Sequence, residues 1–276
     1  MNATQIPARQ LRLMRNDDLP AAVELSTLAG WKQTAEDWRM LMGLAPAGCF
    51  ALEVEGKLVS TTTLLSYGRR LAWIGMVLTH PDYRGRGFAS RLLRHVLEYA
   101  DSSAIETIKL DATELGRPIY ERFGFSAEQP VMRWVRPGDD KSCIRSGHGR
   151  CDENWRGLDI EAFGADRWPL LQKLSGRCQV SSRSNAFLFA RAGRVTAYLG
   201  PCVASTREAA RELITGCLAT HSTSWCWDLL PSNQGATALA SELGFAPQRH
   251  LTRMYRGKPL NGRDDMVYAL AGFELG

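Results

Sequence analysis

The chain has 276 residues, of which 45% are hydrophobic and 23% are charged, and its formal net charge at pH 7 is +5. This composition is typical of a folded globular protein, and the length favours two domains of ordinary size. No apolar run approaches the roughly 20 residues of a membrane-spanning helix. The N-terminal residues contain no apolar signal segment. We therefore expect a cytoplasmic protein without a membrane anchor.

The seven cysteines are widely spaced and form no Cys-x-x-Cys pair. We expect reduced, mostly buried thiols, and none of them stands in a recognisable nucleophile setting. The Lys and Arg residues are scattered, without the aromatic-basic interleaving of a nucleic-acid-binding surface. The mild positive charge suits a polyanionic cofactor at least as well as nucleic acid. No nucleic-acid partner and no metal site are therefore predicted.

The first half of the chain mixes extended and helical patterns. Alternating or continuous apolar runs predict strands at 10–14, 49–54, 58–65, 71–78, 107–110 and 131–135. Caps and helical spacing predict helices at 16–29, 34–42, 88–101 and 119–123. Glu55-Gly56-Lys57 predicts a tight hairpin, and Gly124 is expected to end the last of these helices.

The segment from Arg84 to Ser90 stands between a predicted strand and a predicted helix, and it contains Gly85 and Gly87. Glycines let the backbone approach an anion, and the first turn of a helix directs unpaired N–H groups and a positive dipole outward. Taken alone, Arg-Gly-Arg-Gly fits a solvated loop or a nucleic-acid contact as well as it fits an anion-binding turn. The strand-loop-helix order favours an anion-binding turn.

The polar, glycine-containing stretch 136–150 predicts a linker, so the expected domains are residues 1–137 and 151–276, joined by 138–150. The second half repeats the plan in weaker form. It has predicted strands at 186–190, 195–199 and 225–230, a helix that begins with a Ser205/Glu208 capping box, and a helix at 233–243. Counted back from the two Gly-Phe stops, Asn233 aligns with Thr113, and Ala240 replaces Tyr120.

These motifs resemble those of the GNAT superfamily of acyl-CoA-dependent N-acyltransferases, in a tandem arrangement. The family's loop, Gln/Arg-x-x-Gly-x-Gly/Ala, matches Arg84, Gly87 and Ala89. Its later motif, Asn-x-x-Ala-x-x-Leu-Tyr-x-x-x-Gly-Phe, matches Ile119, Tyr120, Gly124 and Phe125, whereas Thr113 and Gly116 depart from it. The second half keeps the Asn, Ala, Leu and Gly-Phe, but Pro201-Cys202-Val203-Ala204 stands in place of the loop.

The resemblance implies an α+β fold of two tandem GNAT-like domains, each with a mixed, mostly antiparallel, V-splayed central sheet flanked by helices. Acetyl-CoA, the cosubstrate, would lie in the split beside the fourth strand. The first domain would be catalytic, and the second would be degenerate because it lacks the pyrophosphate loop. The segment from Arg84 to Ser90 would then be the chain's single cofactor site.

The resemblance also implies transfer of the acetyl group from acetyl-CoA to a primary amine of a small molecule, by direct attack in a ternary complex. Tyr120 would be the general acid for the departing thiolate, unless it is a core tyrosine. Loop N–H groups would hold the pyrophosphate, and strand backbone groups would pair with the pantetheine. The expected cofactor-binding residues are Met76, Val77, Leu78, Arg84, Gly85, Arg86, Gly87, Phe88, Ala89, Ser90 and Thr113.

The general base is left unassigned. Glu53, Asp111, Glu114 and a water relay are candidates, and each carboxylate also fits a solvated or cap-forming role. Asp111 is favoured because it ends a strand near the loop. Trp31 lies between the first two helices and is a candidate wall of the acceptor pocket, or else a core residue. Asp111 and Trp31 are therefore the predicted acceptor-binding residues.

Other functions are left open. The chain could bind acyl-CoA as a sensor without turnover, or it could acetylate a protein or peptide. The second half could shape the acceptor pocket, swap a strand, or form a homodimer interface.

Overall fold

The structure, a computed structural model, describes residues 9–138, 149–193 and 196–276. The chain forms two compact units: the first unit is Met1–Ser66 with Ala72–Ile105, and the second unit is Tyr67–Leu71 with Glu106–Gly276. Residues 139–148 of the predicted linker lie outside the described residues. The last division along the chain between these units follows Ile105. The domain limits expected around residues 137 and 151 stay a prediction.

The first unit contains the strands β1 (Arg9–Leu13), β2 (Cys49–Val54), β3 (Lys57–Tyr67) and β4 (Leu71–Thr79), which are neighbours in this order. β1 pairs antiparallel with β2, and β2 with β3. β3 contacts β4 through the Ser60 and Thr61 hydroxyls, which donate to the carbonyls of Leu78 and Met76 respectively. From Ser60 to Thr61 the partner residue in β4 moves back from Leu78 to Met76, so β3 and β4 are antiparallel as well. The predicted hairpin at 55–57 is confirmed, with Glu55 and Gly56 both in left-handed conformations.

Three α-helices complete the first unit: α1 (Leu19–Leu28), α2 (Ala35–Leu44) and α3 (Phe88–Ser102), with short 3₁₀ turns at η1 (Asn16–Asp18) and η2 (Pro81–Tyr83). The predicted capping box of α2 is present, because the Thr34 side chain accepts from the Asp37 N–H while Asp37 accepts from that of Thr34. α3 packs on β2, where the Phe50 ring lies 4.7 Å from the His95 ring and 5.8 Å from that of Tyr99.

The strands of the second unit are β5 (Thr107–Ala112), β6 (Ser126–Arg136), β7 (Gln179–Arg183), β8 (Ala186–Arg191), β9 (Ala197–Ala204), β10 (Trp225–Leu229), β11 (Ala246–Gly257) and β12 (Val267–Ala269). Their order is β5-β11-β6-β10-β9-β8-β7, and β12 pairs with β9. β9 and β10 run parallel, whereas the other pairs in this order are antiparallel.

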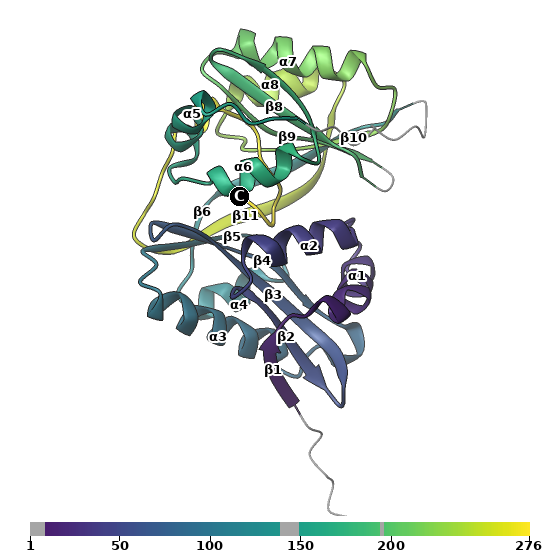
Figure 1. Ribbon diagram of the computed structural model, residues 1–276, viewed down its shortest axis with the longest axis vertical. Coiled ribbons are helices and arrows are strands. Elements are labelled where there is room, and N and C mark those ends of the chain that lie inside the picture. The colour runs from purple at the N-terminus through teal and green to yellow at the C-terminus, as the bar shows by residue number, and fades with distance from the viewer. Residues whose placement is uncertain (1–8, 139–148, 194–195) are drawn as a thin grey trace, which may run out of the picture. The chain divides into compact units, whose positions relative to one another are not determined.

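β6 and β11 exchange places between the two halves of the sequence. β6, which precedes the predicted linker, lies between β11 and β10, whereas β11, from the end of the chain, lies between β5 and β6 (Figure 1). The strand exchange that the sequence left open is therefore present. The two sequence halves are joined by continuous hydrogen bonding, so neither half completes its sheet without the other.

Five helices flank this sheet: α4 (Arg117–Arg122), α5 (Asn154–Phe163), α6 (Trp168–Ser175), α7 (Arg207–Ala219) and α8 (Gln234–Glu242). The side chains of β8 alternate between two of them. The rings of Phe187 and Phe189 meet Trp155 of α5 at 5.4 and 6.2 Å, whereas Leu188 belongs to the core cluster that contains the buried face of α7. Helices thus cover both faces of β8, as Figure 1 shows.

The structure differs from the sequence prediction in three respects. The helix predicted to begin with Ser205 begins one residue later, because the Thr206 hydroxyl, and not that of Ser205, accepts from the Ala209 N–H. No elements were predicted where α5, α6, β7, β11 and β12 form. The strands β3, β5 and β6 extend beyond their predicted limits, and in β5 the polar Asp111 pairs with Arg253 of the neighbouring β11.

The six cysteines that the structure describes are thiols outside any disulfide, and five of them are buried, as expected; Cys143 lies outside the described residues. Burial raises the pKa of the Cys49 and Cys217 thiols to about 12 each, which disfavours a thiolate nucleophile. None of the helices in the described part of the chain is long and apolar enough to cross a bilayer.

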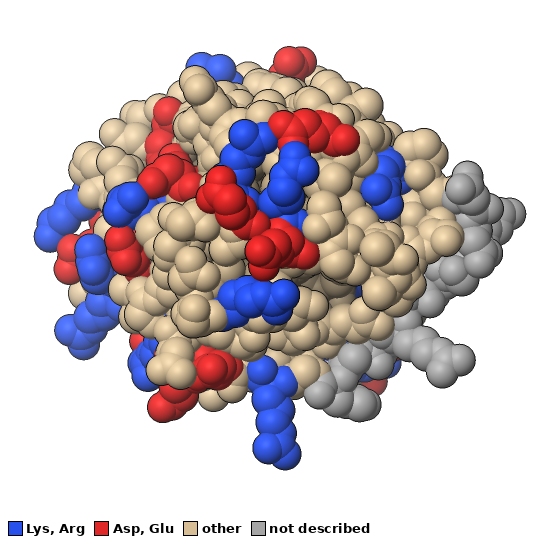
Figure 2. All heavy atoms as spheres, turned by 90° about the horizontal axis from the view of Figure 1, so that it is seen from above, with Lys and Arg blue, Asp and Glu red and all other residues tan. Residues whose placement is uncertain are grey.

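The face that carries α7 shows positive and negative side chains side by side (Figure 2). Three ion pairs contribute: Arg207 and Arg211 both bond to Glu242, and Arg183 lies 3.4 Å from Glu212. Since opposite charges alternate here, this face does not carry a single-sign field.

Candidate functional site

The predicted anion-binding turn joins β4 to α3 in the first unit. Gly85 and Gly87 have φ angles of +73° and +76°, a left-handed conformation that favours glycine. Gly87 is the N-cap of α3, and no side chain caps this helix. The first N–H groups of α3 and its positive dipole end are therefore available to an anion.

The two arginines of the turn are positioned by the main chain. The Arg84 guanidinium donates to the carbonyl of Thr79 at 3.2 Å, and that of Arg86 donates to the carbonyl of Asp82 at 2.9 Å. The Arg86 guanidinium also lies 5.0 Å from the centre of the Tyr83 ring. Both acceptors are main-chain carbonyls, and no carboxylate of the described residues pairs with either guanidinium, which suits a site for phosphate.

β4 is irregular at the residues expected to meet pantetheine. Met76 has a φ of +51° although it is not a glycine, and its side chain is buried. Its carbonyl accepts from the Thr61 hydroxyl at 2.9 Å, and that of Leu78 accepts from Ser60 at 2.6 Å. A left-handed non-glycine residue costs about 1–3 kcal/mol, and such strain clusters at ligand sites.

Tyr120 lies on α4 of the second unit and is partly buried. Its ring packs edge-on against Phe125, with the centroids 6.0 Å apart. Its hydroxyl has no hydrogen-bond partner among the residues that the structure describes. Burial raises the pKa of the Tyr120 hydroxyl, so that it stays protonated at neutral pH and can donate a proton. Its assignment as the general acid stays a prediction.

Thr113 is used locally. Its hydroxyl accepts from the Gly116 N–H at 3.1 Å and so closes the turn before α4. Asn233 makes the same contact in the second half, where its side-chain oxygen accepts from the Ala236 N–H at 2.9 Å. The residue-by-residue alignment of the two halves at this motif is therefore matched by equivalent turns. Whether Thr113 also meets a cofactor stays a prediction.

Asp111 forms a buried, two-pronged ion pair with Arg253 of β11. The Arg253 Nε and Nη2 atoms lie 2.9 and 3.1 Å from the two carboxylate oxygens, and the Asp111 side chain is 0% exposed. An acceptor amine would have to compete with this pair. The acceptor-binding role of Asp111 stays a prediction, and Arg253 is a residue that the sequence analysis did not single out.

The two other general-base candidates, Glu53 and Glu114, and the predicted acceptor-binding Trp31 have different surroundings. Glu53 accepts from the Arg12 guanidinium at 2.8 and 3.0 Å, and Arg12 also binds Asp18. Glu114 is exposed, as expected for a solvated carboxylate. Trp31 is partly buried in the connection between α1 and α2, where its backbone N–H donates to the Ser26 carbonyl at 2.8 Å. The acceptor-binding role of Trp31 stays a prediction.

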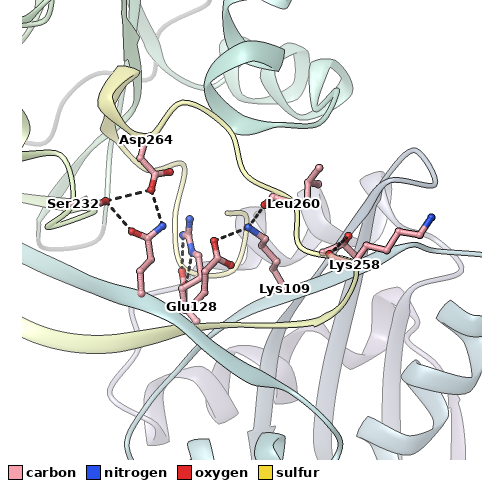
Figure 3. Close-up of polar contacts among 10 residues, drawn as sticks. Lys109, Glu128, Ser232, Lys258, Leu260 and Asp264 are labelled. Atoms are coloured by element: carbon pink, nitrogen blue, oxygen red, sulfur yellow. Dashed lines mark hydrogen bonds and ion pairs between the residues drawn. The ribbon is translucent and has the colours of Figure 1, made fainter.

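A second polar cluster, missed by the sequence analysis, lies where β5 and β6 meet the segment after β11 (Figure 3). The Lys109 ammonium donates to Glu128 at 2.8 Å and to the Leu260 carbonyl at 2.5 Å. Asp264 accepts from Gln129 at 2.9 Å. Burial lowers the pKa of Lys109, and Glu128 opposes this change. The signal was the polar alternation of Lys109 and Asp111 within an otherwise apolar strand.

Glu128 has one buried oxygen to spare. Its Oε1 atom binds Lys109, while Oε2 is buried without a hydrogen-bond partner in the described part of the chain. A buried carboxylate oxygen without a donor is costly, so this group can accept one more hydrogen bond. Among the described residues, no three His, Cys, Asp or Glu side chains converge as metal ligands would.

Two family models match the chain. One, the acetyltransferase (GNAT) family, matches residues 12–125, and the other, an acetyltransferase (GNAT) domain, matches residues 156–269. Together they cover both halves of the sequence, on either side of the predicted linker.

Three curated proteins are similar in sequence. An uncharacterised N-acetyltransferase, YitH, of Bacillus subtilis is 25% identical over 97% of this chain and 98% of its own length. The glucosamine 6-phosphate N-acetyltransferase of Trypanosoma brucei brucei is 28% identical over 47% of this chain and 97% of its own length. The holothin acyltransferase of a Pseudoalteromonas species is 24% identical over 93% of both chains.

Solved structures share the fold. A protein of Pyrococcus horikoshii classed as an acetyltransferase is 20% identical and matches with a TM-score of 0.84 over 100% of this chain and 99% of its own. A GCN5-related N-acetyltransferase of Sphaerobacter thermophilus matches with a TM-score of 0.62 at 13% identity, over 93% and 98% of the two chains. With both halves matched by GNAT models, the chain belongs to the GNAT acetyltransferases, as an acyltransferase with two GNAT domains in tandem.

Proposed function

We propose that this enzyme transfers the acetyl group of acetyl-CoA to a primary amine of a small molecule. The observation that carries the proposal is the start of α3, where two left-handed glycines and an uncapped helix end lie beside Arg84 and Arg86. N–H groups from Arg84 to Ser90 would hold the pyrophosphate, since they combine close backbone approach with positive charge.

The strained part of β4 would bind the acyl end of the same molecule. The left-handed Met76 makes β4 irregular at this point, and N–H groups at Met76, Val77 and Leu78 would serve the ligand there. Donors fixed before the reaction stabilise a carbonyl that develops negative charge. The thioester carbonyl is the group that such donors would polarise.

The reaction needs two proton movements. The amine nitrogen attacks the carbonyl carbon, so that an N–C bond forms and the C–S bond breaks. The nitrogen then gives up one proton, and the departing thiolate gains one. Tyr120 would supply the proton to sulfur from its hydroxyl, which burial keeps in the protonated form. The proton on nitrogen would pass to Asp111 or to a water, and the tight pairing of Asp111 with Arg253 favours the water.

The catalytic part is assigned to residues 1–137, since the loop, Met76 and Tyr120 all lie there. The trypanosomal relative matches 47% of this chain over 97% of its own length, which supports an acetyltransferase of about half this chain's length. That relative is a glucosamine 6-phosphate N-acetyltransferase, so its acceptor is an amino sugar phosphate. It supports a small-molecule amine as the acceptor, with Trp31 and Asp111 as proposed contacts.

An amine-panel assay that follows release of free CoA would test the function. The panel contains amino sugar phosphates, amino acids, polyamines and a peptide N-terminus. We expect amine-dependent CoA release in wild type and none in Gly87→Trp, which fills the turn. Gly157→Trp is the matched control, because Gly157 is an exposed glycine on α5 with open space around it. Binding of acetyl-CoA without release for any amine would contradict the proposal and indicate a sensor.

A further inference from the structure

The second half of the chain contains a pair of parallel strands that part from each other. β9 and β10 pair at three positions, which end with Leu199 opposite Trp227. Beyond this point β9 pairs with β12, where Cys202 lies opposite Ala269. On the other side, the Leu270 N–H donates to the carbonyl of Asp228 in β10 at 2.8 Å. The segment that contains β12 therefore bridges the two diverging strands.

This segment is buried. Val267, Tyr268, Ala269 and Leu270 are each at most 4% exposed. The Trp227 indole N–H donates to the Tyr268 carbonyl at 2.7 Å, and the Tyr198 hydroxyl donates to that of Leu270 at 3.0 Å. The segment thus satisfies the backbone and side-chain polar groups that two parting strands would otherwise leave unpaired.

Gly200 shows how closely the segment approaches β9. Its φ is +139°, and a Cβ built on it would lie 2.1 Å from the Leu270 carbonyl oxygen. A side chain at this position would drive the segment out. The close approach thus depends on glycine at a backbone conformation that other residues rarely adopt.

Asn233 holds the same segment from the α8 side. Its side-chain oxygen caps α8, while its NH₂ group lies 3.0–3.1 Å from the carbonyl oxygens of Asp264, Asp265 and Val267. Asn233 is 4% exposed. Both ends of this amide are therefore used within the chain, and the donors are used by the C-terminal segment.

The approach to this segment is pinned as well. The Thr107 hydroxyl donates to the Lys258 carbonyl at 2.7 Å, and Lys109 donates to that of Leu260. Further along, Asp264 accepts from Gln129 and from Ser232, as Figure 3 shows. The chain from β11 to β12 is thus held along the sheet by side chains of β5 and β6.

We propose that residues 264–270 are the permanent ligand of the second half, in the strand split where an active half would take an acyl-CoA arm. Asn233 of the motif Asn233-x-x-Ala236 binds this segment through its NH₂ group. A tethered segment competes at an effective concentration on the order of millimolar, so a free ligand does not displace it. The second half therefore binds no acyl-CoA, and each chain binds one.

The stoichiometry of acetyl-CoA binding to the full chain tests this by calorimetry. We expect one site per chain in wild type and none in Gly87→Trp. Two sites in wild type, or binding that persists in Gly87→Trp, would overturn the inference. This arm rests on the proposed function: a wild-type chain that binds no acetyl-CoA at all would reject that function, and the exchange experiment below would then decide the inference alone.

Hydrogen exchange tests the segment directly. In wild type we expect slow exchange over residues 264–270, unchanged by saturating acetyl-CoA. Asn233→Ala should speed exchange there by at least about tenfold, because the contacts of the Asn233 NH₂ group with three carbonyl oxygens of the segment are lost. Asn261→Ala is the matched control, since Asn261 is an exposed asparagine on the same connection. The inference fails if wild type exchanges fast at 264–270, if acetyl-CoA speeds exchange there, or if Asn233→Ala exchanges like wild type.

Discussion

Two strand-to-helix passages, β4 to α3 and β9 to α7, begin alike and finish differently. In both, a largely buried strand leads into a helix with a buried apolar face. α3 starts at Gly87 without a capping side chain, whereas the Thr206 hydroxyl caps α7 by accepting from the Ala209 N–H at 3.2 Å. The first helix end offers N–H groups to a ligand, and the second satisfies one of its own.

The strands β4 and β9, which precede these two helices, also differ in how their backbone is paired. β4 is strained at Met76 and, among the described residues of its own unit, has no segment such as β12 along it, whereas β9 pairs with β12 beyond Gly200. Buried backbone groups must be paired. In the second half, the segment that contains β12 supplies hydrogen bonds to both β9 and β10 from the chain itself.

Tyr120→Phe gives the largest expected effect, because it removes the proposed general acid. Tyr120 has no counterpart in the second half, where the fully buried Ala240 stands at the equivalent position. We expect kcat to fall about 100-fold or more, the usual worth of a positioned general acid, while the KM for acetyl-CoA changes less than about twofold. Steady-state kinetics with the best amine measures both. Tyr99→Phe, on α3, is the control and should behave as wild type. An unchanged kcat would remove Tyr120 from the mechanism.

Gly87→Asp would make the first passage resemble the second, by placing a capping carboxylate at the start of α3. Its negative charge would stand near the proposed pyrophosphate, so we expect the Kd for acetyl-CoA to rise about 100-fold. Calorimetric titration measures this change. Gly87→Ala carries a similar backbone strain at φ +76° without the charge. Equal losses for both variants would mean that strain, and not charge, decides binding.

Thr206→Ala removes the cap that distinguishes α7. The free energy of unfolding should fall by about 1 kcal/mol, the usual cost of a lost N-cap, with no change in acetyl-CoA affinity. Urea unfolding and calorimetry test the two parts. Thr215→Ala, at a partly buried position on the same helix where the hydroxyl donates to the Arg211 carbonyl, should cost less. A loss of affinity in Thr206→Ala would place a ligand contact in the second half.

The pH profile of kcat gives the smallest effect. Burial raises the pKa of Tyr120 above its ordinary value of about 10, so the protonated, donating form persists to higher pH. An ordinary tyrosine would be about half deprotonated at pH 10, and kcat would be about half its plateau value. We expect kcat at pH 10 to stay closer to the plateau. A twofold fall between pH 9 and pH 10 that Tyr120→Phe abolishes would show that the pKa is not raised.

Local features of the fold could be predicted because they depend on residues a few positions apart. The hairpin at Glu55-Gly56, the capping box of α2 and the glycine turn before α3 all formed as expected. The equivalence of Thr113 and Asn233 also followed from counting, since each accepts from an N–H three residues on. The site loop belongs to this class, because its chemistry comes from one helix end and its own glycines.

β11 escaped prediction because it is a polar strand. Its sequence includes Arg249, His250, Arg253 and Arg256, which do not resemble a buried strand. In the structure, Arg253 is neutralised by Asp111, a residue 142 positions away. The role proposed for Asp111 was limited in the same way, since sequence could not show that both carboxylate oxygens were already bound.

The sequence by itself therefore determined the turn from Arg84 to Ser90, the helix that follows it and the degenerate repeat, because caps, turns and periodicity act over a few residues. Only the tertiary structure decided that β6 and β11 change places and that residues 264–270 lie between β9 and β10. Those outcomes depend on pairing between strands distant in sequence, and many partners would satisfy a strand edge equally well until the whole sheet is assembled.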